Sequence, residues 1–274
     1  MANAPKPTVA NNESSGSSIF ASLSMVTCLI VGFLLWKFVM GHGSHFQGGD
    51  NTGHPISGDY FGMVYKGGFI VPILMGMLLM VIVFSIERFI VINKASGKGN
   101  IDVFVKKIQV QLRAQNIDAA IAECDKQQGS VANVIKSGLK KYKEVETDVV
   151  MDTEQKCLAI QKDIEEATAL EMPMLEQNLT VIATLVSVGT LTGLLGTVSG
   201  MIKAFGGLAT AGAPDQSELA NGISEALINT AVGIATSTFS IIFYNVFTSK
   251  IDKLTYSIDE AGFSIVQTYA STHK

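Results

Sequence analysis

Charged residues are scarce in this chain of 274 residues, because they make up 16% of it where a soluble domain usually carries about 25%. This deficit and a hydrophobic share of 47% argue against an ordinary soluble enzyme and indicate an integral membrane protein. The formal net charge is −4, so the chain lacks the positive excess that nucleic-acid binding requires. No nucleic-acid partner is therefore expected.

Cysteine is also scarce, and the placement of the cysteines argues against a disulfide framework or a cysteine metal site. The three cysteines (Cys28, Cys124 and Cys157) are odd in number and have no spacing typical of metal ligands or paired disulfides. We expect three unpaired thiols. No nucleophile–base pair and no glycine-rich phosphate loop is recognisable, so the sequence predicts neither an enzyme nor a cofactor.

Long apolar runs are what the chain does have. Four segments are long enough to cross a hydrocarbon core of ~30 Å, which takes ~20 helical residues: 19–40, 68–92, 178–205 and 222–249. The first has an apolar core that is too long for a signal peptide and no clear cleavage site after it, so we expect a retained helix. The sequence predicts an all-α, multi-pass transmembrane protein with four membrane helices and a cytoplasmic helical domain.

Lysine and arginine predict the orientation. The stretch between the second and third spans is rich in lysine, whereas residues 41–67 contain Lys66 alone and residues 206–221 contain none. Since basic loops stay in the cytoplasm, the lysine-rich stretch is expected there. Two spans precede it and two follow it, so both termini are expected in the cytoplasm as well. Lys203, near the outer end of the third span, is expected to extend its ammonium group toward external water.

The chain divides accordingly into nine parts. They are a flexible N-terminal tail (1–18), an extra N-terminal membrane helix (19–40), an external loop (41–67), a membrane helix (68–92), a cytoplasmic helical domain (93–175), a third membrane helix (176–206), an external loop (207–221), a fourth membrane helix (222–249) and a cytoplasmic tail (250–274). In the cytoplasmic domain, apolar residues at helical spacing predict helices over 101–112, 118–126 and 130–143 and from about Thr147 to Met174, with a break at Gly129.

The external loop 41–67 carries three histidines, His42, His45 and His54. Imidazole is a good metal ligand, but no cysteine or clustered carboxylate accompanies these residues. We therefore favour a flexible loop over a metal site.

The third span carries glycines at regular helical spacing. Gly189, Gly193, Gly196 and Gly200 step by four, three and four residues, which puts them on one stripe of a helix. Small residues in such a stripe let a second membrane helix approach closely. The sequence therefore predicts a helix–helix packing face.

The same span is rich in threonine and serine, and the fourth span carries a carboxylate. Asp215, Ser217 and Glu218 favour a helix N-terminus before that span. Glu225 follows inside it, with Asn229 one turn further on the same face. A carboxylate within a membrane indicates function by default, because its buried ionised form is costly when unpaired. Glu225 also lies within two turns of the helix start, so an interfacial position facing external water is equally compatible with the sequence.

Two segments resemble the ExbB/TolQ/MotA family of ion-channel motor subunits, above all its ExbB branch. Residues 194–205 (LLGTVSGMIKAF) look like the family's glycine–threonine–glycine helix, and residues 222–234 (GISEALINTAVGI) look like its glutamate-bearing helix, which 241–247 continue. Weaker similarities lie at 85–89 and 122–139. The resemblance covers roughly 69–247 and gives the extra first helix no counterpart.

The resemblance implies a partner set and a site. It implies a homopentameric ring in the bacterial inner membrane that surrounds the helices of ExbD-like single-span subunits. Proton flow through this assembly would supply energy, which a TonB-like protein would transmit to outer-membrane transport. The resemblance makes the helices 176–206 and 222–249 pore-side helices. By matched position it assigns the family glutamate to Glu225 and the pore-facing threonines to Thr197 and Thr230. Asn229 adds a polar group there, and Na⁺ is an alternative to the proton.

Other interpretations stay open. A TolQ-like, gliding or flagellar-type motor subunit is the nearest alternative. A single-chain solute carrier is a second, although the inverted repeat of many carriers is not recognisable here. A passive membrane scaffold is a third.

Overall fold

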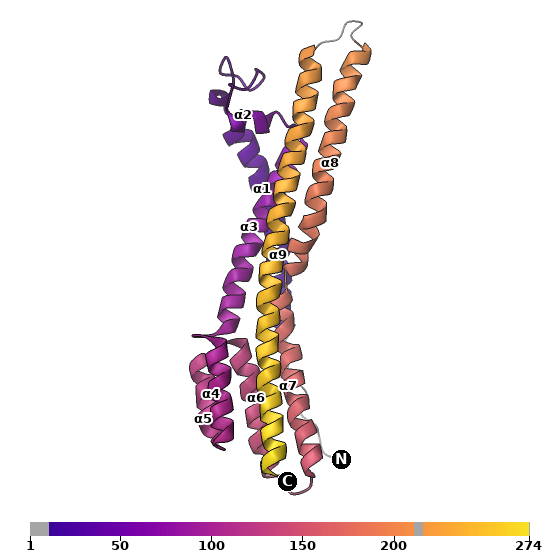
Figure 1. Cartoon of the computed structure of the whole chain (residues 1–274). Helices are drawn as coiled ribbons and strands as arrows, with labels where there is room; N and C mark the ends of the chain where they lie inside the picture. Colours follow the sequence, from indigo (N-terminus) through magenta and orange to yellow (C-terminus); the bar gives the residue numbers. More distant parts are fainter. Residues whose placement is uncertain (1–10, 211–215, 274) are drawn as a thin grey trace. The chain divides into compact units, whose positions relative to one another are not determined.

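The computed structural model describes residues 11–210 and 216–273, and within them the fold is all-helical (Figure 1). Four helical segments of this described part are long and apolar enough to cross a membrane: Ala21–Met40, Ile70–Arg113, Thr153–Gly206 and Leu219–Thr272. The predicted all-α, multi-pass class is confirmed. The chain divides into two compact units, one of residues 1–85 and 181–243 and one of residues 86–180 and 244–274.

The first unit contains the extra helix. α1 (Asn11–Leu34) continues through a π-helical turn (Leu35–Met40), and α3 (Ile70–Ser96) contributes its first half to this unit. The two helices cross where glycine faces glycine, since a Cβ on Gly32 would lie 2.6 Å from the backbone nitrogen of Gly76. This contact places the extra helix directly against the next span.

The segment between these two helices is folded, where the sequence suggested a flexible loop. It contains a 3-10 turn (Gly43–His45) and the short helix α2 (Tyr60–Tyr65). The indole of Trp36 stacks on the Tyr65 ring and its Nε1 donates to the Tyr65 carbonyl at 3.2 Å. The Asp59 carboxylate caps α2 and accepts a 2.7 Å hydrogen bond from His45. The aromatic and capping contacts hold the residues that lead into α3.

The second unit is a helical domain that matches the predicted seams. It comprises α4 (Ile101–Arg113), α5 (Ile117–Gln127), α6 (Gly129–Glu146), α7 (Thr153–Glu176) and the last part of α9. The break at Gly129 is confirmed, because Gln128 and Gly129 both have positive φ. α7 begins at Thr153 and not near Thr147, since Asp152 and Gln155 form a capping box there.

Two long helices complete the chain, α8 (Leu179–Thr210) and α9 (Gln216–Thr272). Residues 250–272, assigned above as a tail, continue α9, and in the second unit Ile258, Ile265 and Tyr269 are buried. Of the predicted terminal tail, residues 1–10 lie outside the described residues, and α1 has begun by Asn11. Asp215 and the side chains of Ser217 and Glu218 also lie outside them.

Candidate ion pathway between helices α8 and α9

Helices α8 and α9 lie side by side in the first unit (Figure 1). Glycine sets their separation. A Cβ on Gly193 would lie 3.0 Å from the Asn229 carbonyl oxygen, and one on Gly200 would lie 2.8 Å from the Gly222 carbonyl oxygen. A Cβ on Gly233 of α9 would lie 2.8 Å from the Cα of Gly193. Gly189 and Gly196 also face α9. All four glycines of the stripe therefore lie against α9 at a separation that larger residues would not allow.

Polar side chains pair across this contact at three levels. Lys203 Nζ donates to Glu225 Oε1 at 2.7 Å. The hydroxyl groups of Thr197 and Thr230 hydrogen-bond to one another, and the Thr190 hydroxyl donates to Ser237 Oγ at 2.7 Å. We call these three pairs the polar ladder. They follow one another along the helix pair, and the glycines lie between the two helices.

The Glu225 carboxylate occupies a partly enclosed position at one end of the ladder. Its side chain is 15% exposed, whereas that of Lys203 is 58% exposed. On another side the carboxylate lies against Gly68, where a Cβ would meet Glu225 Oε1 and Cδ. Gly68 has φ of +79°, a conformation that L side chains rarely adopt. The backbone before α3 can therefore approach the carboxylate because residue 68 is glycine.

Asn229 lies beside the ladder and is fully buried. Its Nδ2 donates to the Gly67 carbonyl at 2.9 Å, while its Oδ1 has no hydrogen-bond partner among the described atoms. The side chain packs on Gly196 of α8, where a Cβ would lie 2.6 Å from Asn229 Cγ. Asn229 thus joins α8, α9 and the segment before α3. Its predicted part in an ion pathway stays a prediction.

The spacing of the ladder limits its chemistry. The pairs are six and seven residues apart along α8, which at 1.5 Å per residue separates them by about 9 and 10 Å. A proton cannot pass directly between groups that far apart, because transfer needs heavy atoms within ~3 Å or a water between them. Hydroxyl and carboxylate groups at this spacing can support a water-filled path or contact side chains of a partner subunit.

The resemblance singled out Thr197 and Thr230, which the structure pairs with one another, and their pore-facing position stays a prediction. The partners at the other two levels were not predicted. Sequence reasoning expected Lys203 to extend outward, whereas the ammonium group binds Glu225. The register carried a usable signal. In an antiparallel helix pair, a step toward the C-terminus on one helix matches a step toward the N-terminus on the other. Once Thr197 faces Thr230, Lys203 must face the turn that contains Glu225.

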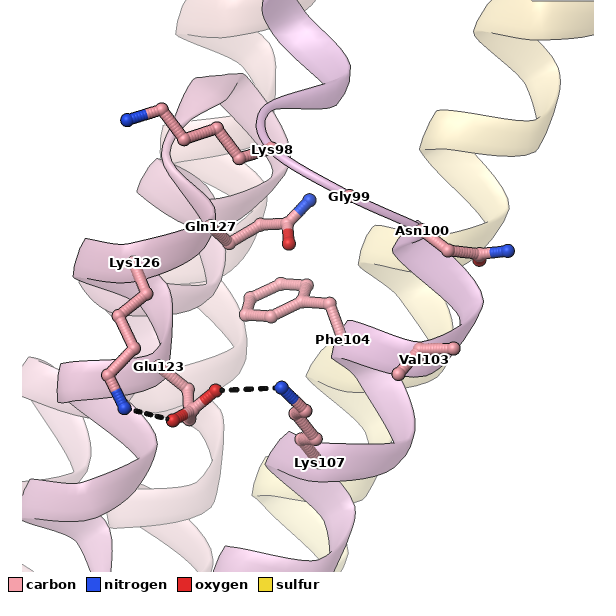
Figure 2. Close-up of a pocket in the computed structure, with 9 residues that line it drawn as sticks. All are labelled: Lys98, Gly99, Asn100, Val103, Phe104, Lys107, Glu123, Lys126 and Gln127. Carbon is pink, nitrogen blue, oxygen red and sulfur yellow. Dashed lines mark hydrogen bonds and ion pairs between the residues drawn. The ribbon is translucent and has the colours of Figure 1, made fainter.

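A pocket of about 300 Å³ in the second unit is a different kind of site. Figure 2 shows Lys107 and Lys126 directed at Glu123, at 3.4 and 2.5 Å, while the end of Lys98 points away from them. The hydrogen bond from Lys126, together with that from Lys107, lowers the pKa of Glu123 below its ordinary value. The carboxylate is therefore ionised at neutral pH and already pairs with the two nearest ammonium groups, so we assign no ligand to this pocket.

These features define a class of protein: a multi-pass helical membrane protein with a polar ladder in a tight, glycine-lined helix pair. Comparison with known families gives the class a name. Residues 126–260 match the MotA/TolQ/ExbB proton channel family, and over this region the chain belongs to that family. The matched residues include Glu225 and the ladder.

Known proteins of the same kind match parts of the chain. The protein named ExbB-like 3 of Synechocystis sp. is 34% identical over 112 residues, which are 40% of this chain and 53% of that protein. The Tol-Pal system protein TolQ of Pseudomonas aeruginosa is 31% identical over 124 residues, 45% of this chain and 54% of TolQ. The biopolymer transport protein ExbB of Pseudomonas putida is 33% identical over 86 residues, 31% of this chain and 26% of that ExbB. The match thus spans about half the length of the first two relatives.

Proposed function

We propose that this chain is an ExbB-type subunit of a motor driven by the proton-motive force, and that the polar ladder forms part of its ion pathway. The observation that carries the proposal is the ladder itself, since Glu225 pairs with Lys203 and Thr197 pairs with Thr230 between α8 and α9, within the region that matches the proton channel family. One chain supplies three such levels, too few to line a continuous path, so several copies and a second kind of subunit are part of the proposal.

The assembly would be a ring of copies of this chain, a homopentamer by resemblance, that encloses the membrane helices of ExbD-like subunits. A TonB-like protein would carry the work to outer-membrane transport. The lysine-rich stretch supports a cytoplasmic position for the helical domain and both termini. The family resemblance supports a bacterial inner membrane. A TolQ-like function is the nearest alternative, favoured by the similarity to TolQ.

The test separates ion conduction from assembly. The complex is purified from native membranes with the subunits that accompany the full chain, and is reconstituted in vesicles. A potassium diffusion potential then drives proton entry, which a pH-sensitive dye reports. We expect Glu225→Gln to reduce the flux to that of protein-free vesicles, because the substitution keeps the size of the side chain and removes its charge. The mass of the complex should not change.

Matched controls exclude general damage. Glu166→Gln makes the same change on α7, where the Glu166 side chain is 67% exposed, and should leave the flux unchanged. Thr197→Ala should lower the flux, whereas Thr27→Ala on α1 should not, because the Thr27 hydroxyl donates to its own helix at Leu23. Normal flux in Glu225→Gln within an intact complex would refute the assigned pathway. Normal flux in Thr197→Ala as well would favour a passive scaffold.

A further inference from the structure

The pair formed by Lys203 and Glu225 bears on which ion the pathway admits. The ammonium group lies 2.7 Å from Glu225 Oε1, the distance of a charge-assisted hydrogen bond. It therefore occupies the position that a free cation would take on that oxygen. Gly68 lies against the same oxygen atom.

A second cation at this carboxylate would lie within a few ångströms of the ammonium group. Like charges at that separation repel strongly wherever water is partly excluded. The carboxylate is 15% exposed, so screening by water is incomplete there. A proton is not subject to the same exclusion, because it travels by relay through water and hydroxyl groups and needs no coordination shell.

Asn229 Oδ1 lies beside the ladder without a hydrogen-bond partner, but it is a single uncharged amide oxygen and does not by itself replace the hydration shell of a cation. The Thr197 and Thr230 hydroxyl groups are engaged with one another, and the Gly67 carbonyl accepts from Asn229. Among the residues that the structure describes, no cluster of three histidine, cysteine or acidic side chains is placed to hold a metal ion. Glu225 is thus the carboxylate of the ladder that a cation would seek, and it already has a counter-ion.

We propose that Lys203 is a specificity-determining residue, whose ammonium group acts as the tethered counter-ion of Glu225 and excludes Na⁺ from this carboxylate. The consequence for transport rests on the proposed function, whereas the exclusion of Na⁺ from Glu225 can be measured on the chain alone. Lys203 acts on the ion pathway through its contact with Glu225, and we assign it no role in assembly.

Binding can be tested without transport. The melting temperature of the full chain in detergent is compared in NaCl and in choline chloride at equal ionic strength. An ion that binds the folded state raises the melting temperature by mass action. We expect no difference for the unsubstituted chain and a higher melting temperature in NaCl for Lys203→Gln. Lys203→Arg keeps the positive charge and should respond like the unsubstituted chain.

Two further variants make the test specific. Lys66→Gln removes an ammonium group that binds the Thr52 carbonyl in the neighbouring loop, and should not create a response to Na⁺. The double substitution Lys203→Gln with Glu225→Gln should abolish the response, because it removes the carboxylate as well. A sodium response that survives in this double variant, or its absence in Lys203→Gln, would overturn the proposal.

The flux assay then shows the consequence for transport. With Lys203→Gln, replacing choline by Na⁺ should lower proton flux by about fivefold, which corresponds to the upper end of what a partly exposed ion pair contributes. The unsubstituted complex should conduct equally in both salts. If flux in the unsubstituted complex requires Na⁺, Lys203 does not exclude it and the proposal fails. Refutation of the proposed function would appear separately, as normal proton flux in Glu225→Gln.

Discussion

The close approach of α8, α9 and the segment before α3 can be tested by adding a single methyl group. At Gly196 a Cβ would lie 2.6 Å from Asn229 Cγ and 2.8 Å from Asn229 Nδ2, both well inside van der Waals contact. The Asn229 side chain is fully buried, so it has no solvent into which it can swing. In Gly196→Ala it must shift and strain its hydrogen bond to the Gly67 carbonyl.

The cost has two parts. Overpacking a well-packed interior costs typically 1–3 kcal/mol, so about 2 kcal/mol is a central value here. Loss of the bond between Asn229 Nδ2 and the Gly67 carbonyl adds about 1 kcal/mol, because a buried donor is left without its acceptor. We therefore expect Gly196→Ala to lower the free energy of unfolding by about 3 kcal/mol, or the melting temperature by roughly 5–15 °C.

The same helix offers a matched control. Gly206 also lies in α8, and a Cβ there would meet nothing within 4 Å. Because alanine favours a helix over glycine by about 1 kcal/mol, Gly206→Ala should keep or raise the melting temperature. Thermal unfolding of the full chain in detergent, followed by helical circular dichroism, measures both variants.

A double substitution tests the stated cause. Asn229→Gly removes every side-chain atom that the new methyl group strikes, Asn229 Cβ included, so Gly196→Ala should cost less in that background than in the unsubstituted chain, by about 1–3 kcal/mol of coupling. The described packing is incorrect if Gly196→Ala and Gly206→Ala have the same melting temperature. It is also incorrect if the effects of the substitutions at 196 and 229 on the free energy of unfolding are additive.

Two more predictions concern residues away from the ladder. Arg88 is buried and donates to two carbonyls at the end of α7 and to the Glu87 carboxylate. Arg88→Met should therefore lower the free energy of unfolding by about 3–5 kcal/mol in denaturant unfolding, whereas Arg113→Met, at an exposed position, should change it by no more than about 0.5 kcal/mol. Equal effects of the two substitutions would contradict the role of Arg88 in capping α7. The hydrogen bond from His45, followed by those from the backbone of α2, lowers the pKa of Asp59 below its ordinary value. The stabilisation of α2 should therefore be complete above about pH 4, the unfolded pKa, and lost as the pH falls through the lower folded pKa. Hydrogen exchange of residues 60–65 measures this loss, and Asp59→Asn should abolish its pH dependence; protection that rises with acidity would refute the sign.

Much of the fold follows from the sequence because it depends on local patterns. The four spans are set by length and apolarity, and the seams of the second unit are set by residues such as Phe104, Ile108 and Ile135, which are buried as their spacing predicts. The glycine stripe likewise indicated a crowded helix before its partner was known. Each of these signals lies within one helix, so one helix suffices to recognise it.

The predictions that failed or fell short depend on a local cap or on contacts between distant segments, and apolar spacing and composition report neither. The start of α7 is set by the capping box at Asp152, a local signal that the apolar pattern alone does not contain. The loop 41–67 is held by Trp36, which lies before it in the chain, and the end of α9 is held by burial in the second unit. Flexibility was inferred from polar composition, and composition does not report such contacts.

The sequence by itself determined the class of this protein, its four spans and the identity of the polar residues, because hydropathy and helical period are properties of the chain. Only the tertiary structure decided that Lys203 binds Glu225, that Gly68 lies against the same carboxylate and that Asn229 reaches the Gly67 carbonyl. These contacts join residues up to 162 positions apart. The register between helices fixes them, and no single stretch of sequence contains that register.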